Sequence, residues 1–366
     1  MTLRDVVLVE AEALTDLVTA VFERTSCSPA ESRRIAKNLV EANLTGHDSH
    51  GVVRVPRYVD YLANDVQRAG KELVTLLDHG PLLLVDGDYG MGQTVGPLAV
   101  DVGIERAREH GLAIVALRKA GHLGRIGAFA EQAAAQGLVS MHIVNVANSR
   151  LVAPFGSTDR RMGTNPYAFG VPRPDAPPVI HDFATSIVAE GKTMVALQGG
   201  PAVPDNALVG PNGITGDPSV LYSQSPGQRP DSNGGVGALR AMGDHKGSGL
   251  SVMCELLAGA LTGTGTAGPD EIRFANGMLS IYIDPTRIDP DDSFADSVTS
   301  YIDWFLAANP IDADDPVKLP GDRERERMSE RLANGITLTA ALWRSIADSA
   351  RSVGVPSAAI EQVASL

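Results

Sequence analysis

The chain has 366 residues, of which 43% are hydrophobic and 20% charged, so it can bury a core of two or three packed units. Its 44 acidic and 31 basic side chains give a formal net charge of −13. Such a field repels polyanions, and no lysine–arginine cluster offsets it, so we expect no nucleic-acid partner, whereas a small anionic substrate remains compatible.

The N-terminal stretch "MTLRDVVLVEAEALTD" carries acids within its apolar run, which argues against a signal peptide, and the sequence predicts a helical start. In "SPAESRRIAKNLVEANLTG", Ser28 is the expected N-cap, Pro29 the first helical residue and Glu31 the second half of a capping box. Gly46 is expected to end this helix, so residues 47–58 are predicted to form a loop.

From about residue 80 the pattern alternates between strands and helices. The runs "LLLVD", "LAIVAL" and "LVSMHIVNV" predict buried strands, separated by helices over about 93–110 and 126–136. A Pro/Gly/Asn-rich section, about 199–236, is predicted to form long loops. An apolar helix, a strand "GMLSIYID" and three further helices follow, of which the one with the charge run 322–331 is expected to be solvated. This order predicts an α/β protein. No apolar stretch is long enough to span a membrane, and the two cysteines give no disulfide framework, which is typical of a cytoplasmic protein.

One GxGxxG pattern occurs, "GTGTAG" at residues 263–268. It follows an apolar helix, whereas the dinucleotide-binding fingerprint follows a strand and opens a helix. We therefore interpret it as a helix-terminating loop, and any nicotinamide cofactor would be bound without the Rossmann signature.

The segment "KAGHLGRIGAFAEQAAAQG" follows a predicted strand and opens a helix. Gly121, Gly124 and Gly127 would let a ligand approach the backbone, and free N–H groups at the helix start favour an anion. His122 stands at the carboxyl end of the strand, where α/β sheets bind ligands. The alternative is a glycine-rich turn with an incidental histidine.

Residues 161–192 are dense in polar groups. Asp182 follows a short apolar run and is expected at a strand end, and Thr185 and Ser186 supply hydroxyls. A binding site and simple strand termination with helix capping explain this pattern equally well.

In "GDHKGSGL", His245 and Lys246 precede an apolar helix. A lysine at a helix N-terminus opposes the helix dipole, and a bound phosphate would resolve that conflict. An exposed lysine with negligible cost is the alternative.

The segment "TGHDSHGVVRVPRY" concentrates reactive side chains. His47 and His50, with Asp48, could hold a metal, and a second His-Asp pair in "VIHDFATS" suggests a metal-dependent hydrolase, but no HExxH or CxxC motif supports a metal. A proton-donor role for His50 fits better, because histidine titrates near neutral pH. Ser49 could orient it, and Arg54 could bind a substrate carboxylate.

Several long motifs in order, from about residue 40 to 325, carry a family resemblance: "ANLTGHDSHG", "GHLGRIGAFAEQAA", "RMGTNPYAFGVPR", "HDFATSIVAEGK", "HKGSGLSVMCELLAGALTG" and "LPGDRE". With them the sequence resembles the malate/L-lactate dehydrogenase family, whose α/β fold is not Rossmann. The resemblance implies an oxidoreductase that moves a hydride between NAD or NADP and a small 2-oxo acid, and a homodimer. It also implies an NAD(P)-binding domain over 79–290, between helical segments 1–78 and 291–366 that pack together.

The resemblance also implies roles for individual residues. His50 would be the proton donor with Ser49 and Asp182 as its relay, although in some members the histidine matching His122 is the acid/base, and both remain candidates. Arg54, Thr164 and Asn165 would contact the substrate. No metal is implied. The implied cofactor contacts are Gly124, Arg125, Ile126, Asp182, Phe183, Ala184, Thr185, Ser186, His245, Lys246, Asn276, Pro320, Gly321, Asp322 and Arg323.

Three alternatives stay open. The same family contains reductases of cyclic 2-imino acids. The His-Asp pairs leave a metal-dependent hydrolase, and a chain that kept the fold could be a non-catalytic binder of small molecules. Ser248 stands where many family members carry an aromatic residue, so the choice between NAD and NADP is open as well.

Overall fold

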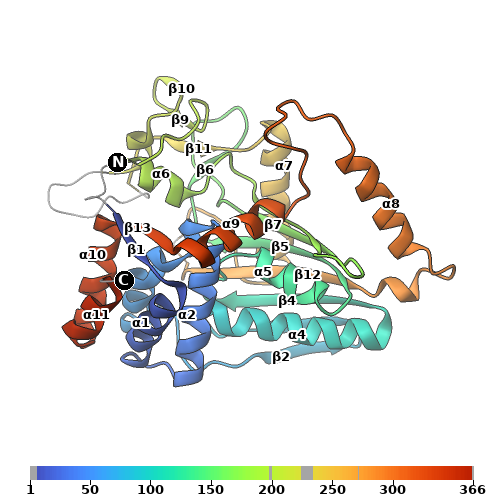
Figure 1. Cartoon of the computed structure of the whole chain (residues 1–366), viewed down its shortest axis with the longest axis horizontal. Coiled ribbons are helices and arrows are strands. Elements are labelled where there is room, and N and C mark those ends of the chain that lie inside the picture. Colours follow the sequence, from blue (N-terminus) through green and yellow to red (C-terminus); the bar gives the residue numbers. More distant parts are fainter. Residues whose placement is uncertain (1–5, 198–199, 224–233, 271, 365–366) are drawn as a thin grey trace.

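The computed structural model describes residues 6–197, 200–223, 234–270 and 272–364. At its centre is a seven-stranded sheet in the order β2-β3-β4-β12-β5-β7-β8 (Figure 1). Only β3 and β4 pair in parallel in this sheet, and the other neighbours are antiparallel. The predicted α/β class is confirmed. The strands are β2 (Val74–His79), β3 (Leu82–Asp86), β4 (Leu112–Ala120), β12 (Ala275–Ile283), β5 (Val139–Ala147), β7 (Pro166–Val171) and β8 (Val179–Ala184).

Helices cover both faces of this sheet. Successive strand residues point to opposite faces, so Val115 and Leu117 belong to one apolar cluster and Ala116 to another. The first cluster packs against α4 (Gly92–His110) and α5 (Gly127–Ala134), and the second against α7 (His245–Cys254) and its π-helical continuation η5 (Glu255–Ala260). The near-continuous apolar character of the strands follows from burial on both sides.

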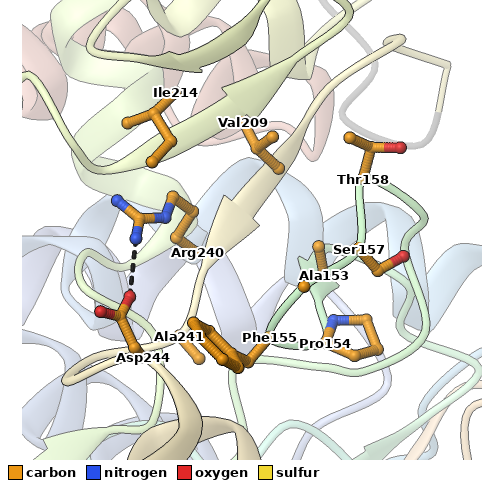
Figure 2. Close-up of a pocket in the computed structure, with 11 residues that line it drawn as sticks. Ala153, Pro154, Phe155, Ser157, Thr158, Val209, Ile214, Arg240, Ala241 and Asp244 are labelled. Atoms are coloured by element: carbon orange, nitrogen blue, oxygen red, sulfur yellow. Dashed lines mark hydrogen bonds and ion pairs between the residues drawn. The ribbon is translucent and has the colours of Figure 1, made fainter.

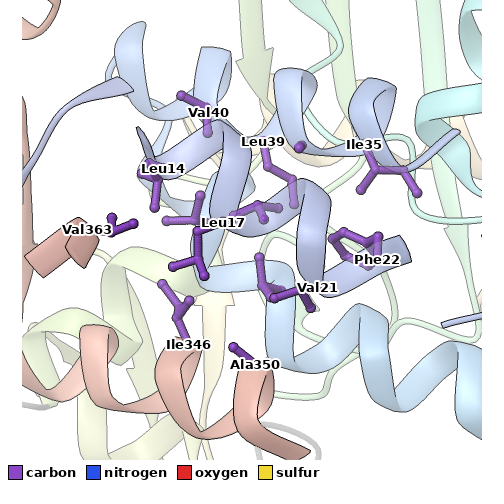
Figure 3. Packing of buried hydrophobic residues seen from close by; sticks show 14 of the residues in the cluster. Leu14, Leu17, Val21, Phe22, Ile35, Leu39, Val40, Ile346, Ala350 and Val363 are labelled. Atoms are coloured by element: carbon purple, nitrogen blue, oxygen red, sulfur yellow. The ribbon is translucent and has the colours of Figure 1, made fainter. Parts of the chain in front are cut away.

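The N- and C-terminal helices share one core, as expected from the sequence. Leu14, Leu17 and Val21 pack with Ile346 and Ala350 of the C-terminal segment (Figure 3). The helices involved are α1 (Ala11–Glu23), α2 (Pro29–Leu44), α3 (Val55–Ala63), α10 (Ala340–Ser352) and α11 (Ser357–Ala364). The two segments therefore bury their apolar stripes against each other. The exact boundaries at 78 and 290 remain a prediction.

The expectation of a helical start was wrong for the first described residues. Val6–Val9 form β1, which pairs antiparallel with β13 (Ile336–Thr339). Each strand is only four residues long, so neither stands out locally, and each is stable only because the other lies beside it.

The capping box predicted at the start of α2 is half formed. Ser28 accepts a hydrogen bond from the Glu31 amide, as expected. The Glu31 carboxylate instead accepts from the Gly70 amide (2.8 Å) and the Thr94 hydroxyl (3.0 Å). It thereby ties α4 and the segment before β2 to α2. Gly46 ends the helix with φ of +82°, as predicted.

Part of the predicted long-loop section is a second, small sheet. Its order is β10-β9-β11-β6, and it encloses its own apolar cluster beside α6 (Glu190–Leu197). Residues 198–199 and 224–233 of the section lie outside the described residues. The strands are β10 (Gly213–Thr215), β9 (Leu208–Gly210), β11 (Ala238–Arg240) and β6 (Val152–Ala153).

Two C-terminal helices lie on the outside of the molecule. No side chain of α9 (Asp322–Asn334) is buried, as the charge run predicted. In Figure 1, α8 (Phe294–Leu306) projects from the body, and its Tyr301 and Trp304 are 62% and 71% exposed. None of the described helices is long and apolar enough to cross a membrane.

Candidate active site

The segment after α2 is more ordered than the predicted loop. It forms two 3-10 turns, η2 (Asp48–His50) and η3 (Val52–Arg54), which lead into α3. The buried Asn43 side chain holds both turns: it donates to Asp48 Oδ1 (2.6 Å) and accepts from the Val52 amide (2.8 Å). A Cβ at Gly51 would lie 2.2 Å from Asn43 Oδ1, so only glycine leaves room for this clamp.

Asp48 anchors the site to α9. Its carboxylate pairs with Arg331 at 2.6 Å, and Arg331 also donates to the Asn43 carbonyl. Asp48 is therefore committed to protein partners. Across the described ranges, no group of three or more His, Cys, Asp or Glu side chains is arranged to hold a metal.

The two candidate acid/base histidines lie in one site. The rings of His50 and His122 are stacked, with centroids 5.7 Å apart and an interplanar angle of 7°. Ser49 Oγ lies 3.1 Å from Nδ1 of His50, which agrees with the orienting role expected for Ser49. Burial, and after it the positive charge of Arg54, lower the pKa of His50 to about 3 and that of His122 well below its usual value.

Sequence reasoning missed two residues behind His122. The Tyr58 hydroxyl lies 2.6 Å from Nδ1 of His122, and Gln93 Nε2 donates to the same hydroxyl (3.1 Å). Tyr58 is the last residue of the segment "TGHDSHGVVRVPRY" and stands four residues after Arg54. This spacing of one helical turn was the signal that the sequence offered for Tyr58. Gln93 gave no such signal, because only the fold brings α4 beside α3.

Arg54 is placed to bind an anion beside both histidines. Its Nε donates to the Ser49 carbonyl (2.7 Å), which fixes the guanidinium. Among the described residues, its two terminal nitrogens have no hydrogen-bond partner. A carboxylate bound there would use these donors in the bidentate geometry that arginine favours.

Asp182 is not at a strand end but inside β8, and it caps a helix from a distance. Its Oδ2 accepts from the Gly127 amide (2.7 Å) at the start of α5. One of the N–H groups predicted to attract a ligand anion, that of Gly127, thus already donates to the protein's own carboxylate. Burial raises the pKa of Asp182, while the charge of His47 opposes that shift. Although both residues are described, no hydrogen bond joins Asp182 to His50, so the proposed relay stays a prediction.

Of the residues expected to bind the cofactor, those at 182–186, 245–246 and 320–323 follow β8, whereas Gly124, Arg125 and Ile126 precede α5, and Arg125 and Ile126 are buried. Near its start, the Ile180 amide donates to the Pro320 carbonyl (3.2 Å), beside the predicted contacts Gly321, Asp322 and Arg323. At its end, the Thr185 carbonyl accepts from the Met242 amide (2.9 Å), and Ser186 pairs with Ala241. Segments that are far apart in sequence, 182–186, 241–246 and 320–323, therefore lie along one strand.

The start of α7 differs from the phosphate site that the sequence suggested. The amides of Lys246, Gly247 and Ser248 already donate to backbone carbonyls and are not available to an anion, whereas the side chains of His245 and Lys246 are exposed. A cavity of about 290 Å³ opens beside this turn (Figure 2). Its lining combines the apolar side chains of Phe155, Val209 and Ile214 with the ion pair between Arg240 and Asp244 (2.6 Å).

Two of the predicted contact residues are buried supports. Asn165 is 0% exposed, and its amide donates to Ser251 Oγ (3.0 Å) and Glu255 Oε1 (2.8 Å), so it presents no surface to a substrate. Asn276, 2% exposed, accepts from the Leu123 amide (2.8 Å) and holds the turn that carries His122. Thr164 is partly exposed and its carbonyl receives the Thr185 amide, so a substrate contact by Thr164 stays a prediction.

The geometry can be compared with known proteins. The family model described as malate/L-lactate dehydrogenase matches residues 9–347. The chain belongs to the malate/L-lactate dehydrogenase family. Hydroxycarboxylate dehydrogenase B of Escherichia coli (strain K12) is 38% identical over 353 residues, covering 95% of this chain and 94% of the relative. An L-lactate dehydrogenase of Cupriavidus necator is 35% identical over 327 residues, covering 88% and 90%.

A solved structure described as a putative malate/lactate dehydrogenase from E. coli is also similar. It has a TM-score of 0.89 at 36% identity and covers 98% of both chains. The family, the fold class and the oxidoreductase activity expected from the sequence are therefore confirmed. As a member of this family, the protein is an enzyme of the 2-hydroxyacid dehydrogenase type.

Proposed function

We propose that this enzyme moves a hydride between NAD or NADP and C2 of a small 2-oxo acid, with the 2-hydroxy acid as the reduced form. One observation carries the proposal: the stacked rings of His50 and His122 lie beside Arg54, whose terminal nitrogens are free of protein partners among the described residues. A carboxylate binder beside two proton-transfer groups suits a substrate that has a carboxylate next to its reacting oxygen.

Arg54 would hold the substrate carboxylate. Because its Nε is fixed on the Ser49 carbonyl, the guanidinium loses little freedom when an anion binds. The bound carboxylate would also offset the positive charge that lowers the pKa of His50. Substrate binding would thus make it easier for His50 to carry the proton that the new alkoxide needs.

In the oxidation direction the free enzyme is already prepared. With its pKa lowered to about 3, His50 is neutral near pH 7 and can accept the hydroxyl proton of a 2-hydroxy acid. His122 is neutral for the same reason. Because their pKa values are low, the histidines can act as bases in the free enzyme. His50 can act as an acid only once an anion is bound.

The residues along β8 fit a nicotinamide dinucleotide, which would supply or take the hydride when bound. Lys246 and His245 would face its phosphates, and the cavity beside α7 has an apolar wall and a polar end that suit a nucleoside. The runs Asp182–Ser186 and Pro320–Arg323 would line the path between them. The Arg240–Asp244 ion pair lies at the polar end of that cavity. Rates with NADH and with NADPH distinguish the two cofactors.

We also propose a cytoplasmic homodimer. The free, buried cysteines Cys27 and Cys254 suit a reducing compartment. The exposed Tyr301 and Trp304 on the projecting helix α8 suit a contact with a second copy. Light scattering of the purified protein measures the mass directly, and Trp304→Ser is expected to weaken a dimer built on this helix.

A substrate panel tests the proposed reaction. Small 2-oxo acids and cyclic 2-imino acids are assayed with NADH and NADPH in parallel, and reduced nicotinamide is followed by absorbance. We expect turnover with 2-oxo acids. Turnover with cyclic imino acids alone would reassign the enzyme as an imino acid reductase. Nucleotide binding without any turnover would indicate a non-catalytic binder. A stoichiometric metal in the purified protein would support the metal-dependent hydrolase.

A further inference from the structure

Tyr58 joins three elements behind the reactive histidines. It lies on α3 and is fully buried, while His122 follows β4 and Gln93 belongs to α4. Its hydroxyl lies 2.6 Å from Nδ1 of His122, and Gln93 Nε2 lies 3.1 Å from the hydroxyl oxygen. A buried hydroxyl with these two neighbours has its hydrogen-bonding directions fixed.

The direction of each bond follows from Gln93. The same Nε2 atom also lies 3.0 Å from the main-chain carbonyl of His122, which can only accept a hydrogen bond. The atom in that position must therefore be the amide nitrogen, and it donates to the tyrosine oxygen as well. The Tyr58 hydrogen then has one acceptor within the described structure, Nδ1 of His122.

A ring nitrogen that accepts a hydrogen bond carries no hydrogen. Neutral His122 must therefore carry its hydrogen on Nε2. Nε2 has no protein partner among the described residues, so it is the ring nitrogen available to a ligand. Nδ1 of the stacked neighbour His50 lies 3.1 Å from the Ser49 hydroxyl, which can donate or accept, so this contact leaves both tautomers of His50 open.

We propose that Tyr58 is a positioning residue that holds His122 as the neutral Nε2–H tautomer, so that His122 donates a hydrogen bond to the substrate oxygen while His50 gains and loses the proton. This inference rests on the proposed function. In reduction, the carbonyl carbon gains the hydride, the π pair of the C=O bond moves onto oxygen, and that oxygen takes the proton of His50. The Nε2–H of His122 stays bonded to the same oxygen throughout.

Electrostatics in the site agree with this division. His122 faces Arg54, Arg57 and His50, and each of these disfavours a cation on its ring. Two stacked imidazolium ions would repel each other, so only one histidine can be charged at a time. A neutral imidazole is sufficient for the role given to His122, because its N–H can polarise a carbonyl without carrying a full positive charge.

The first test measures the tautomer without any substrate. The ¹⁵N spectrum of histidine-labelled protein, assigned with His122→Gln, should show His122 as the Nε2–H form at neutral pH. A wild-type His122 that is charged or carries its hydrogen on Nδ1 would overturn the proposal, whatever the enzyme turns over.

The second test uses Tyr58→Phe, which removes only the hydroxyl. We expect His122 to populate both tautomers and to titrate at higher pH, and kcat to fall about tenfold with KM nearly unchanged. Tyr282→Phe is the matched control, because Tyr282 is also fully buried but bonds neither histidine. Tyr58→Phe with wild-type spectra and kcat would refute the inference and leave the proposed function intact. If the wild-type enzyme turned over no 2-oxo acid, the proposed function would be refuted. The ¹⁵N spectrum would still report the tautomer of His122, because it is recorded without substrate.

Discussion

The imidazole rings of His50 and His122 lie parallel, with their centroids 5.7 Å apart, although one ring belongs to η2 and the other to the turn after β4. From the sequence, His50 and His122 were both candidates for the same acid/base role. Because two stacked imidazolium rings would repel each other, only one of them can carry a positive charge, and the hydrogen bond from Tyr58 sets His122 apart from His50. Substitutions at the two positions should therefore give different results, not equal ones.

His50→Asn should lower kcat/KM by roughly 10²–10⁴-fold, because it removes the group that transfers the proton. His122→Ala should cost about tenfold, because it removes a hydrogen-bond donor but leaves the acid in place. Steady-state kinetics over a range of pH distinguish the two, since only His50→Asn should abolish the ionisation seen in kcat. Near-normal turnover by His50→Asn would remove His50 from this role.

Arg54→Lys should raise KM for the 2-oxo acid by roughly 10- to 150-fold with a smaller change in kcat, because lysine cannot form the bidentate pair. Arg57→Lys is the matched control, since Arg57 is exposed and lies three residues further along, on α3. Initial rates at varied substrate concentration give both constants. A wild-type KM in Arg54→Lys would mean that the site needs only a nearby positive charge.

Asp182 has a structural contact and a predicted electrostatic role, and two substitutions separate them. Asp182→Ala leaves the Gly127 amide without its acceptor and should cost about 1 kcal/mol of unfolding free energy, whereas Asp182→Asn keeps an acceptor and should cost less. If the carboxylate charge supports the imidazolium, both variants should lower kcat/KM alike. Full activity in Asp182→Asn would reduce Asp182 to a helix cap.

His142 should make the fold sensitive to acid. It is 0% exposed between the hydroxyls of Ser140 and Ser280, and burial lowers its pKa to about 3. In the unfolded chain it titrates near the ordinary value of about 6.5, so the unfolded state binds more protons between these limits. The free energy of unfolding should therefore fall as the pH drops below about 6.5, by roughly 1.4 kcal/mol per pH unit for this residue.

Denaturant melts at several pH values measure this dependence, and His142→Gln should make it less steep, while the lowered pKa values of His50 and His122 leave part of it in place. The exposed His79 on β2 provides the control, because His79→Gln should leave the curve unchanged. A wild-type stability that does not change between about pH 6.5 and about pH 4 would contradict the expected cost of charging a buried histidine.

Lys246→Ala should weaken NADH or NADPH binding by roughly tenfold at low salt, and the loss should shrink as ionic strength rises. The backbone amides of Lys246, Gly247 and Ser248 already have backbone acceptors, so in the proposed complex the lysine side chain would carry most of the phosphate attraction there. Quenching of cofactor fluorescence gives the dissociation constants. Lys37→Ala on α2 removes the same charge away from β8 and should bind cofactor normally.

Local chemistry determined most of the secondary structure. The cap at Ser28, the left-handed glycines at 46, 111 and 137, and the apolar strand runs act within a few residues, so they could be identified from the sequence. The pair β1–β13 was missed because its two strands are each stabilised by a partner from the other end of the chain.

The motifs likewise indicated the family and the residues that matter, but not how they meet. The sequence brought His50, Ser49 and Arg54 together because they share one short segment. It placed Asp182 with His50 and made Asn165 a substrate contact, whereas the packed chain puts Asp182 on the first amide of α5 and buries Asn165 against Ser251.

Only the tertiary structure decided the partners of His122. The stacking on His50, the Tyr58 hydroxyl at Nδ1 and the Gln93 amide behind it come from separate elements that pack together. The sequence by itself determines which groups can exchange protons, because that is a property of the side chain. Which ring nitrogen keeps its hydrogen, and which histidine can carry charge, depends on donors, burial and neighbouring charges, and these exist only once the chain has folded.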